Sequence, residues 1–187
     1  MHDSSPVSTP AFSDTLATSR KFHRIARPRV LRTDVWLPRP IEEVFDFFAD
    51  AFNLNALTRL GCIFESWTPA PIVMRAGAII DYKIRLKVVP KTWRTKITAY
   101  EPPFCFVDQQ WREPYSLWHH EHTFRTERGG TMVTDKVHYA LPLNFTPIAG
   151  LIHALMVRRD LDRIFTYLTK RIQALLGERG RQRADQA

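Results

Sequence analysis

Cysteine is scarce in this chain of 187 residues, which contains only Cys62 and Cys105. The two lie far apart and neither belongs to a CxxC or Cys/His pattern, so the sequence indicates no disulfide framework and no cysteine-bound zinc. Unpaired cysteines fit a reducing compartment, and we therefore expect a cytoplasmic protein. The chain also lacks GxSxG, HExxH, GxGxxG and P-loop motifs, so the common signatures of nucleophilic hydrolases, zinc proteases and nucleotide-binding enzymes are missing.

Long apolar runs are absent as well. The longest stretch worth testing as a membrane span, residues 148–157, is interrupted by His153 and reaches about half of the roughly 20 residues that a bilayer requires. The N-terminal residues also lack the continuous apolar segment of a secretory signal. We therefore predict no transmembrane helix.

What the chain does contain is enough apolar material for one folded domain. Hydrophobic residues make up 44% of the sequence and aromatic residues 12%, with 5 Trp and 12 Phe among them. A chain of this length can bury a sizeable core without metal or disulfide support. The aromatic content predicts either a bulky core or a cavity lined by rings.

The net charge of +8 is concentrated at the two ends. Residues 1–29 form a basic extension rich in Ser, Thr and Pro, residues 178–187 form a basic tail, and the folded domain is predicted over 30–177. Nucleic-acid-binding domains usually gather basic residues on a folded face, so we expect no nucleic-acid partner. Peripheral binding of the basic ends to an anionic membrane or to nucleic acid stays open as an alternative.

The first half of the predicted domain combines a strand with one or two short helices. A strand is predicted over 31–37. Pro40 then opens a helix in which apolar residues recur at helical spacing, at Ile41, Val44, Phe45 and Phe48. A shorter helical piece is predicted over 52–60.

The pattern then changes to the period of two that is typical of strands. Residues 78–88 alternate cleanly, with Ile80 and Tyr82 on the apolar face, and Pro90 and Lys91 are predicted to turn the chain into a strand over 92–100. Further strands are predicted over 104–111, 116–127 and 131–141, with Gly129 in the last turn. An antiparallel meander is the simplest topology.

A long helix is predicted over 148–176, where apolar residues return to helical spacing. Gly177 is a natural end for it. The element order predicts an α+β fold with the helices packed on one face of an antiparallel sheet.

Several segments together resemble the START-like (SRPBCC) superfamily of polyketide cyclases/dehydrases and lipid-transport proteins, and in particular its bacterial ligand-binding branch. They are PIEEVF at 40–45, GAIIDY at 77–82, WRTKI at 93–97, PPFCFVDQQ at 102–110, WHHEHTF at 118–124 and DKVHY at 135–139. The resemblance covers residues 30–176. It implies a helix-grip fold, in which a curved antiparallel sheet of about seven strands wraps around a long C-terminal helix. A cavity lies between the sheet and this helix.

The same resemblance implies binding or transport of a small hydrophobic molecule, such as a lipid, an isoprenoid or a polyketide-like compound, with no cofactor. The superfamily also contains enzymes, so a cofactor-independent cyclase or dehydratase is the alternative. The run at 148–157 either packs in the core or lies at a lipid-accessible cavity mouth, with Arg158 and Arg159 near anionic headgroups. The oligomeric state stays open.

Polar residues on the predicted inward faces are candidates for the site. His120 and His122 share one face of their strand with Trp118 and Phe124, and Asp108 and Asp135 project to the same side from the neighbouring strands. Buried Tyr82 and Trp93 carry polar ends that a ligand or water could satisfy. The predicted ligand-binding residues are Tyr82, Trp93, Asp108, Gln110, Trp118, His120, His122, Phe124, Asp135 and Tyr139.

The two histidines and two aspartates of this set, His120, His122, Asp108 and Asp135, allow several roles. They form a satisfied hydrogen-bond network, they orient a ligand, or His120 or His122 acts as a general base paired with Asp135 or Asp108. Two histidines and a carboxylate also have the composition of a metal site, but His120 and His122 are about 6.6 Å apart along a strand, so we expect no metal.

Overall fold

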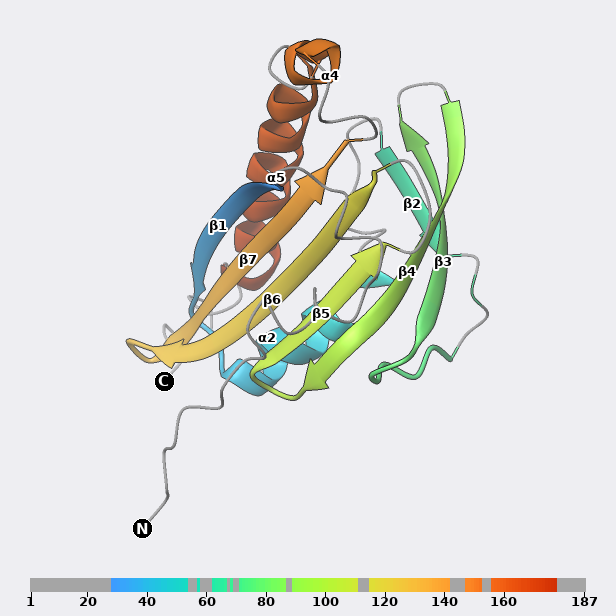
Figure 1. Cartoon of the computed structure of the whole chain (residues 1–187). Coiled ribbons are helices and arrows are strands. Elements are labelled where there is room, and N and C mark those ends of the chain that lie inside the picture. Colours follow the sequence, from blue (N-terminus) through green and yellow to red (C-terminus); the bar gives the residue numbers. More distant parts are fainter. Residues whose placement is uncertain are drawn as a thin grey trace.

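A seven-stranded antiparallel sheet and a long C-terminal helix form the domain (Figure 1). The computed structural model describes residues 28–53, 57, 62–66, 68, 71–86, 89–110, 115–141, 147–152 and 156–177. Within them the strand order is β1-β7-β6-β5-β4-β3-β2. The sheet curves around the helical side, which confirms the predicted α+β helix-grip fold. Apart from residues 28 and 29, the predicted extension lies outside the described residues, as does the predicted tail.

Strand β1 (Arg29–Leu37) leads directly into helix α2 (Ile41–Ala49), as predicted. Pro40 stands at the start of α2, and Glu42 and Glu43 in the first turn favour the positive end of the helix dipole. Val44 and Phe45 are completely buried against the sheet. Of the shorter helix predicted over 52–60, the described positions 53 and 57 are helical and the others, except turn residue 52, lie outside the described residues.

Strand β2 (Cys62–Ser66) lies at one edge of the sheet and pairs only with β3 (Ile79–Leu86) among the described strands. The sequence did not locate this strand. Its five residues form a segment too short for a clear alternating pattern.

The turn between β3 and β4 (Val89–Glu101) lies earlier than predicted. Leu86 pairs with Val89, Arg85 with Pro90 and Ile84 with Lys91, so Pro90 and Lys91 already belong to β4, and the prediction of a turn at these two residues is wrong. Strand β5 pairs with β4 only from Thr95 onward. Within the described residues Pro90 therefore pairs with β3 alone, as at a sheet edge, and strand edges tolerate proline.

The centre of the sheet is formed by β5 (Cys105–Gln110), β6 (Leu117–Glu127) and β7 (Gly130–Ala140), as predicted. Arg128 and Gly129 connect β6 to β7 with φ angles of 52° and 72°. Two consecutive left-handed residues match the right-handed twist of a hairpin. The register places Asp108 opposite His120 and places His122 opposite Asp135.

The terminal helical segment consists of α4 (Pro147–Ile152), α5 (Arg158–Ile172) and a final π-helical turn, η3 (Gln173–Gly177). Helix α5 buries Leu161, Phe165 and Ile172, which confirms the predicted long helix. Of the described apolar positions in residues 148–157, Ile148, Leu151 and Met156 are 71%, 60% and 52% exposed and contradict the packed-core alternative, whereas Val157 packs against the core. None of the described helices is both long and apolar enough to cross a membrane.

Arg39 connects the end of the chain to the start of the domain. Its Nε donates to the carbonyl of Leu176 at 3.0 Å, and its Nη1 lies 2.9 Å from Glu43. The hydroxyl of Thr131 on β7 donates to the carbonyl of Arg39 at 2.8 Å. The side chain of Arg39 is buried, so these contacts hold the last helical turn against the connection between β1 and α2.

Candidate functional site

A cavity of about 210 Å³ lies between the sheet and α5. Its wall is mainly apolar, with Trp93, Phe106 and Trp118 from the sheet and Leu161 and Phe165 from α5. Residues after the end of α2 contribute as well. The resemblance predicted a cavity in this place.

Seven of the ten predicted ligand-binding residues line this cavity: Tyr82, Trp93, Asp108, Trp118, His120, His122 and Asp135. They come from β3, β4, β5, β6 and β7. The alternation of strand side chains is therefore enough to place them on one wall.

The other three predicted residues lie elsewhere. Phe124 packs in the core with Phe45, whose ring centroid lies 5.3 Å away, and Tyr139 packs against Trp118 at 6.3 Å. Gln110 ends β5 and is partly buried beyond the cavity wall. All three share the inward face, but a shared face does not settle whether a residue borders the space or fills it.

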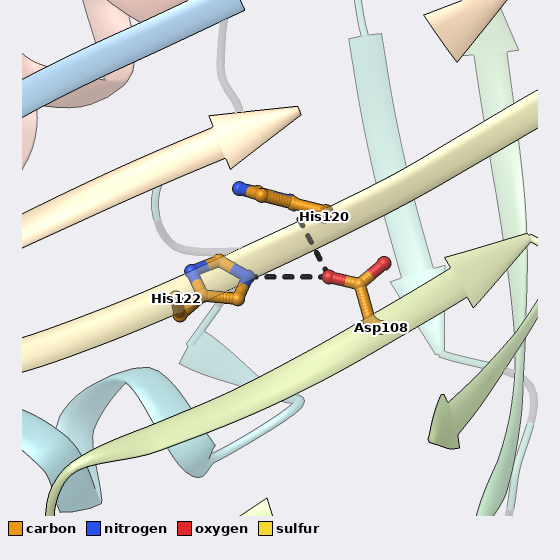
Figure 2. Close-up of side chains that lie close together, drawn as sticks. All are labelled: Asp108, His120 and His122. Carbon is orange, nitrogen blue, oxygen red and sulfur yellow. Dashed lines mark hydrogen bonds and ion pairs between the residues drawn. The ribbon is translucent and has the colours of Figure 1, made fainter. Parts of the chain in front are cut away.

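Asp108 lies between the two histidines (Figure 2). Its Oδ2 is 3.3 Å from Nδ1 of His120 and 3.2 Å from Nε2 of His122. The three side chains are 18%, 14% and 11% exposed, so water has limited access to them.

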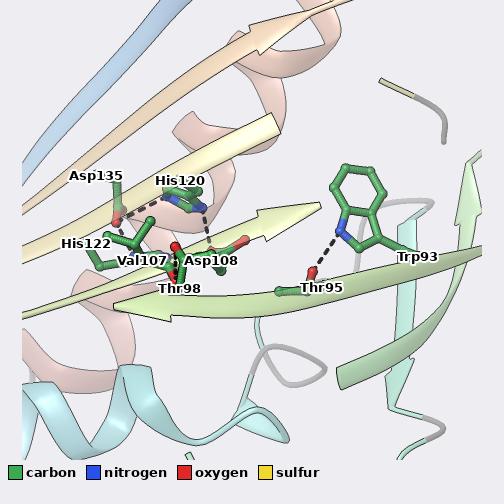
Figure 3. A network of polar contacts seen from close by, with 8 residues as sticks. All are labelled: Trp93, Thr95, Thr98, Val107, Asp108, His120, His122 and Asp135. Atoms are coloured by element: carbon green, nitrogen blue, oxygen red, sulfur yellow. Dashed lines mark hydrogen bonds and ion pairs between the residues drawn. The ribbon is translucent and has the colours of Figure 1, made fainter. Parts of the chain in front are cut away.

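Asp135 lies on the other side of the same two rings (Figure 3). Its Oδ1 is 2.6 Å from Nδ1 of His122 and 3.5 Å from Nε2 of His120. Each imidazole therefore has one nitrogen near Asp108 and the other near Asp135. We call these four residues the His/Asp cluster.

The two imidazoles are much closer than the spacing of their backbone positions indicates. Their ring centroids are 3.8 Å apart, with 40° between the planes. Aromatic rings enclose them: Phe106 stacks on His122 at 4.2 Å, and Phe165 lies 5.8 Å from His120. The His/Asp cluster is therefore a polar group of side chains surrounded by aromatic rings.

Burial and mutual attraction oppose each other in the His/Asp cluster. Burial disfavours the charge on Asp108, but His120 and His122 outweigh it and hold the pKa of this carboxyl well below its usual range. The same balance lowers the pKa of Asp135. Burial lowers the pKa of His120, but Asp108 and Asp135 reverse that effect and raise it to about 9. The two carboxylates therefore favour the imidazolium form of His120.

Tyr82 and Trp93 are the two buried aromatic residues whose polar ends were predicted to need a ligand or a water molecule as a partner. Burial raises the pKa of Tyr82, and Asp108 and Asp50 add to this rise, so the phenol keeps its proton. The indole Nε1 of Trp93 donates to the hydroxyl of Thr95 at 3.0 Å (Figure 3). The protein thus supplies an acceptor for the indole.

Several cavity residues escaped sequence reasoning. Asp50, Ala51 and Asn53 follow α2, and Met74 and Tyr115 lie in irregular segments. None of these residues belongs to a periodic apolar pattern in the sequence, so the sequence does not indicate toward which side their side chains point. The apolar α5 residues Ile164, Phe165, Leu168 and Ile172 do carry such a pattern, which indicates the packed face but not the cavity.

No family model matches the chain, and no curated protein matches it. Solved structures do. Protein Ms6760 from Mycobacterium smegmatis is 17% identical with a TM-score of 0.60, over 82% of this chain and 98% of its own. The Zhui aromatase/cyclase from a Streptomyces species is 11% identical with a TM-score of 0.57, over 80% and 96%. Ara h 8.0201 is 12% identical with a TM-score of 0.55, over 79% and 99%.

These neighbours include members of the SRPBCC superfamily, so the resemblance read from the sequence is confirmed at the level of the fold. Identity below 20% transfers architecture rather than activity.

Proposed function

We propose that this chain, which has the helix-grip fold of SRPBCC proteins, binds a small and mainly apolar molecule in the cavity between the sheet and α5. The observation that carries the proposal is an open space of about 210 Å³ whose polar lining includes the His/Asp cluster. Apolar walls with a few convergent polar groups are typical of sites that bind small molecules.

The size of the cavity limits the ligand. An apolar cavity of about 150 Å³ holds benzene, whereas drug-sized ligands occupy about 300–1,000 Å³. The value of about 210 Å³ lies between these limits. We therefore favour a molecule with about one substituted ring or a short isoprenoid, and a long acyl chain would not fit inside.

The His/Asp cluster determines which polar group such a ligand carries. The imidazolium of His120 can donate to a carbonyl or hydroxyl oxygen, and the carboxylates of Asp108 and Asp135 can accept from a hydroxyl. The two carboxylates repel an anionic ligand. A phenol, alcohol or ketone therefore fits this wall better than a fatty acid.

A cyclase- or dehydratase-type activity is the second candidate, and the protonation of His120 supports it. Asp108 and Asp135 raise the pKa of His120, which favours a proton-donor role for this residue beside its predicted role as a general base. Proton donation to a departing hydroxyl is what a dehydration needs. His122, 2.6 Å from Asp135, would then be the base.

Native mass spectrometry after incubation with cell extract tests both candidates. Binding predicts retention of one unchanged small apolar compound, and turnover predicts release of a converted one. Ala51 lines the cavity, so Ala51→Leu should abolish retention while the protein stays folded. Absence of any retained compound, together with no quenching of tryptophan fluorescence by phenols, short isoprenoids or ketones, would overturn the proposal.

Contact with an anionic membrane is a further candidate, favoured by the exposure of the α4 region. Ile148 and Leu151 project an apolar surface into solvent, and the side chain of nearby Arg158 is 73% exposed. An apolar helix beside cationic side chains is typical of interfacial binding.

Sedimentation with vesicles of phosphatidylserine and phosphatidylcholine tests this contact. Ile148→Glu and Leu151→Glu should reduce binding several-fold without lowering stability. Val73→Glu is the control, because Val73 is 67% exposed and distant in sequence from α4. Equal binding to phosphatidylcholine alone, or equal effects of all three variants, would reject the role of α4.

A further inference from the structure

We propose that Asp108, His120 and His122 form a binding site for a divalent first-row transition-metal ion on the wall of the cavity. The site does not depend on the small-molecule ligand. One oxygen of Asp108 and one nitrogen from each histidine lie within 4.8 Å of one another. Figure 2 shows both imidazoles turned toward the same carboxylate.

The distances suit coordination. Oδ2 of Asp108 is 3.3 Å from Nδ1 of His120 and 3.2 Å from Nε2 of His122. If an ion lay about 2.1 Å from the oxygen and from one of these nitrogens, the ligand–metal–ligand angle would be about 100°, which lies between the tetrahedral and octahedral values. Only small side-chain adjustments are needed to admit the ion.

The sequence argued against a metal because His120 and His122 are two residues apart on a strand. The structure removes this objection, since their ring centroids are only 3.8 Å apart. The rings lean together because each faces an aspartate: Asp108 is opposite His120, and Asp135 is opposite His122. Spacing along the backbone does not fix the spacing of ring nitrogens.

Asp135 supplies the second observation that points to a metal. While Nε2 of His122 faces Asp108, its Nδ1 lies 2.6 Å from Oδ1 of Asp135. His120 has the same arrangement with its two nitrogens exchanged, at a longer 3.5 Å from Asp135. Histidines that bind metals usually donate their other N–H to a carboxylate, which fixes the tautomer and the ring orientation. Asp135 lies within reach of both imidazoles, and Oδ1 of Asp135, Nδ1 of His122 and Nε2 of His120 are buried without a hydrogen-bond partner among the described residues, so a metal that reorients the rings would let these atoms pair.

Charge balance supports the same conclusion. Asp108 and Asp135 carry two negative charges into a wall that is otherwise mostly apolar, with exposed fractions of 18% and 13%. Two imidazolium groups or one divalent cation with two neutral imidazoles would neutralise them. The second arrangement avoids placing two like-charged rings 3.8 Å apart.

The donor set also selects the ion. Two imidazoles and one carboxylate suit Zn²⁺, Fe²⁺, Co²⁺, Ni²⁺ or Cu²⁺, whereas Mg²⁺ and Ca²⁺ prefer oxygen ligands. Three protein ligands leave at least one coordination position, and all three of these residues line the cavity. An oxygen of a bound phenol, alcohol or ketone could occupy it.

Calorimetry of chelator-treated protein with ZnCl₂, and visible absorption with CoCl₂, test the proposal. We expect one ion per chain, and no comparable binding of MgCl₂. Asp108→Asn and His122→Gln should each weaken Zn²⁺ binding at least about 100-fold, and Asp135→Asn about 10-fold or more.

His119→Gln and Asp81→Asn are matched controls. His119 adjoins His120 but is none of the proposed ligands and lies opposite His138 in the sheet, and Asp81 pairs with Arg94 on β4. Both should leave Zn²⁺ affinity unchanged. Circular dichroism confirms folding, and if Asp108→Asn fails to fold, His122→Gln and the Co²⁺ spectrum of the wild type carry the test.

Two results would overturn the metal site: no binding at a 1:1 ratio, or binding that the cluster and control variants weaken equally. Quenching of tryptophan fluorescence by phenol, measured on the chelated protein, reports separately on the cavity. Failure of the metal site therefore leaves the proposed small-molecule function standing, and the reverse also holds.

Discussion

The indole of Trp93 donates its N–H to the hydroxyl of Thr95, two residues along the same strand and on the same face, at 3.0 Å. Both residues line the cavity. The wall therefore satisfies its own indole, and a ligand is not required as the acceptor. The groups of this wall that could form hydrogen bonds with a ligand are therefore those of the His/Asp cluster on β5, β6 and β7.

Replacing Thr95 by Val should lower the free energy of unfolding by about 1 kcal/mol, because the change removes the acceptor while keeping the side-chain shape. Chemical denaturation measures this effect. Thr98→Val is the control, since the hydroxyl of Thr98 makes only a long 3.4 Å contact with the carbonyl of Val107. Equal losses from the two variants would show that the bond from Trp93 contributes nothing.

The cavity predicts opposite effects for two alanines that are close in sequence. Ala51 lines the cavity, whereas Ala49 belongs to the packed core around Phe45. Ala51→Leu should keep or raise stability because it fills space, while Ala49→Leu should cost about 1–3 kcal/mol through overpacking. Thermal unfolding of both variants checks this. Destabilisation of similar size at both positions would mean that no usable space lies beside Ala51.

Removal of one carboxylate from the metal-free His/Asp cluster should be costly. Asp135→Asn leaves the imidazolium of His120 with one carboxylate fewer, and breaking such a buried pair costs about 3–5 kcal/mol. Asp81→Asn breaks the more exposed pair with Arg94 and should cost less than about 1 kcal/mol. Urea unfolding in a chelating buffer compares them. If the two variants lost similar amounts of stability, the His/Asp cluster would be as well solvated as the exposed pair of Asp81 and Arg94.

His138 predicts how stability depends on pH. Burial lowers its pKa to about 4, and Lys136 and His119 add to this effect. The unfolded chain takes up this proton near pH 6.5, so the contribution is complete above 6.5 and is lost as the pH falls toward 4. The loss should be about 1–3 kcal/mol.

Denaturation curves from pH 4 to 7.5 measure that loss. His138→Phe removes the titrating group and should flatten the dependence by the same amount. An unchanged slope in the variant would assign the acid sensitivity to other groups.

Gly130 is required by its contacts. A Cβ at this position would overlap the backbone carbonyl of Leu37 and lie 2.8 Å from the ring of Trp36. Gly130→Ala should therefore cost more than about 2 kcal/mol, because a backbone atom cannot move aside cheaply. Gly150→Ala in α4 meets no atom within 4 Å and should be neutral or slightly stabilising, as measured by thermal melts.

The sequence predicted the sheet, α2 and the terminal helix because each has a sustained apolar period. Alternation on β6 also brought His120 and His122 to the inner face. It could not report how side chains lean across strands, so the convergence of their rings on Asp108 was missed. The same limit applies to the turn before Pro90, where proline was taken as a turn residue although the sheet edge accepts it.

The apolar residues 148–157 show a different limit. Their composition fits a core helix, and only the tertiary arrangement reveals that Ile148 and Leu151 face solvent. Residues such as Met74 and Tyr115 line the cavity from irregular segments, where no periodic pattern indicates the direction of a side chain.

Arg39 anchors only one end of the helical wall. Its contact with the carbonyl of Leu176 joins residues 137 positions apart, and it fixes the C-terminal end of that wall beside α2. The opposite end, at α4, presents apolar side chains to solvent. The two ends of the helical wall therefore differ in their surroundings: the C-terminal end is bonded to the connection between β1 and α2, whereas the end at α4 leaves Ile148 and Leu151 open to contact with another molecule.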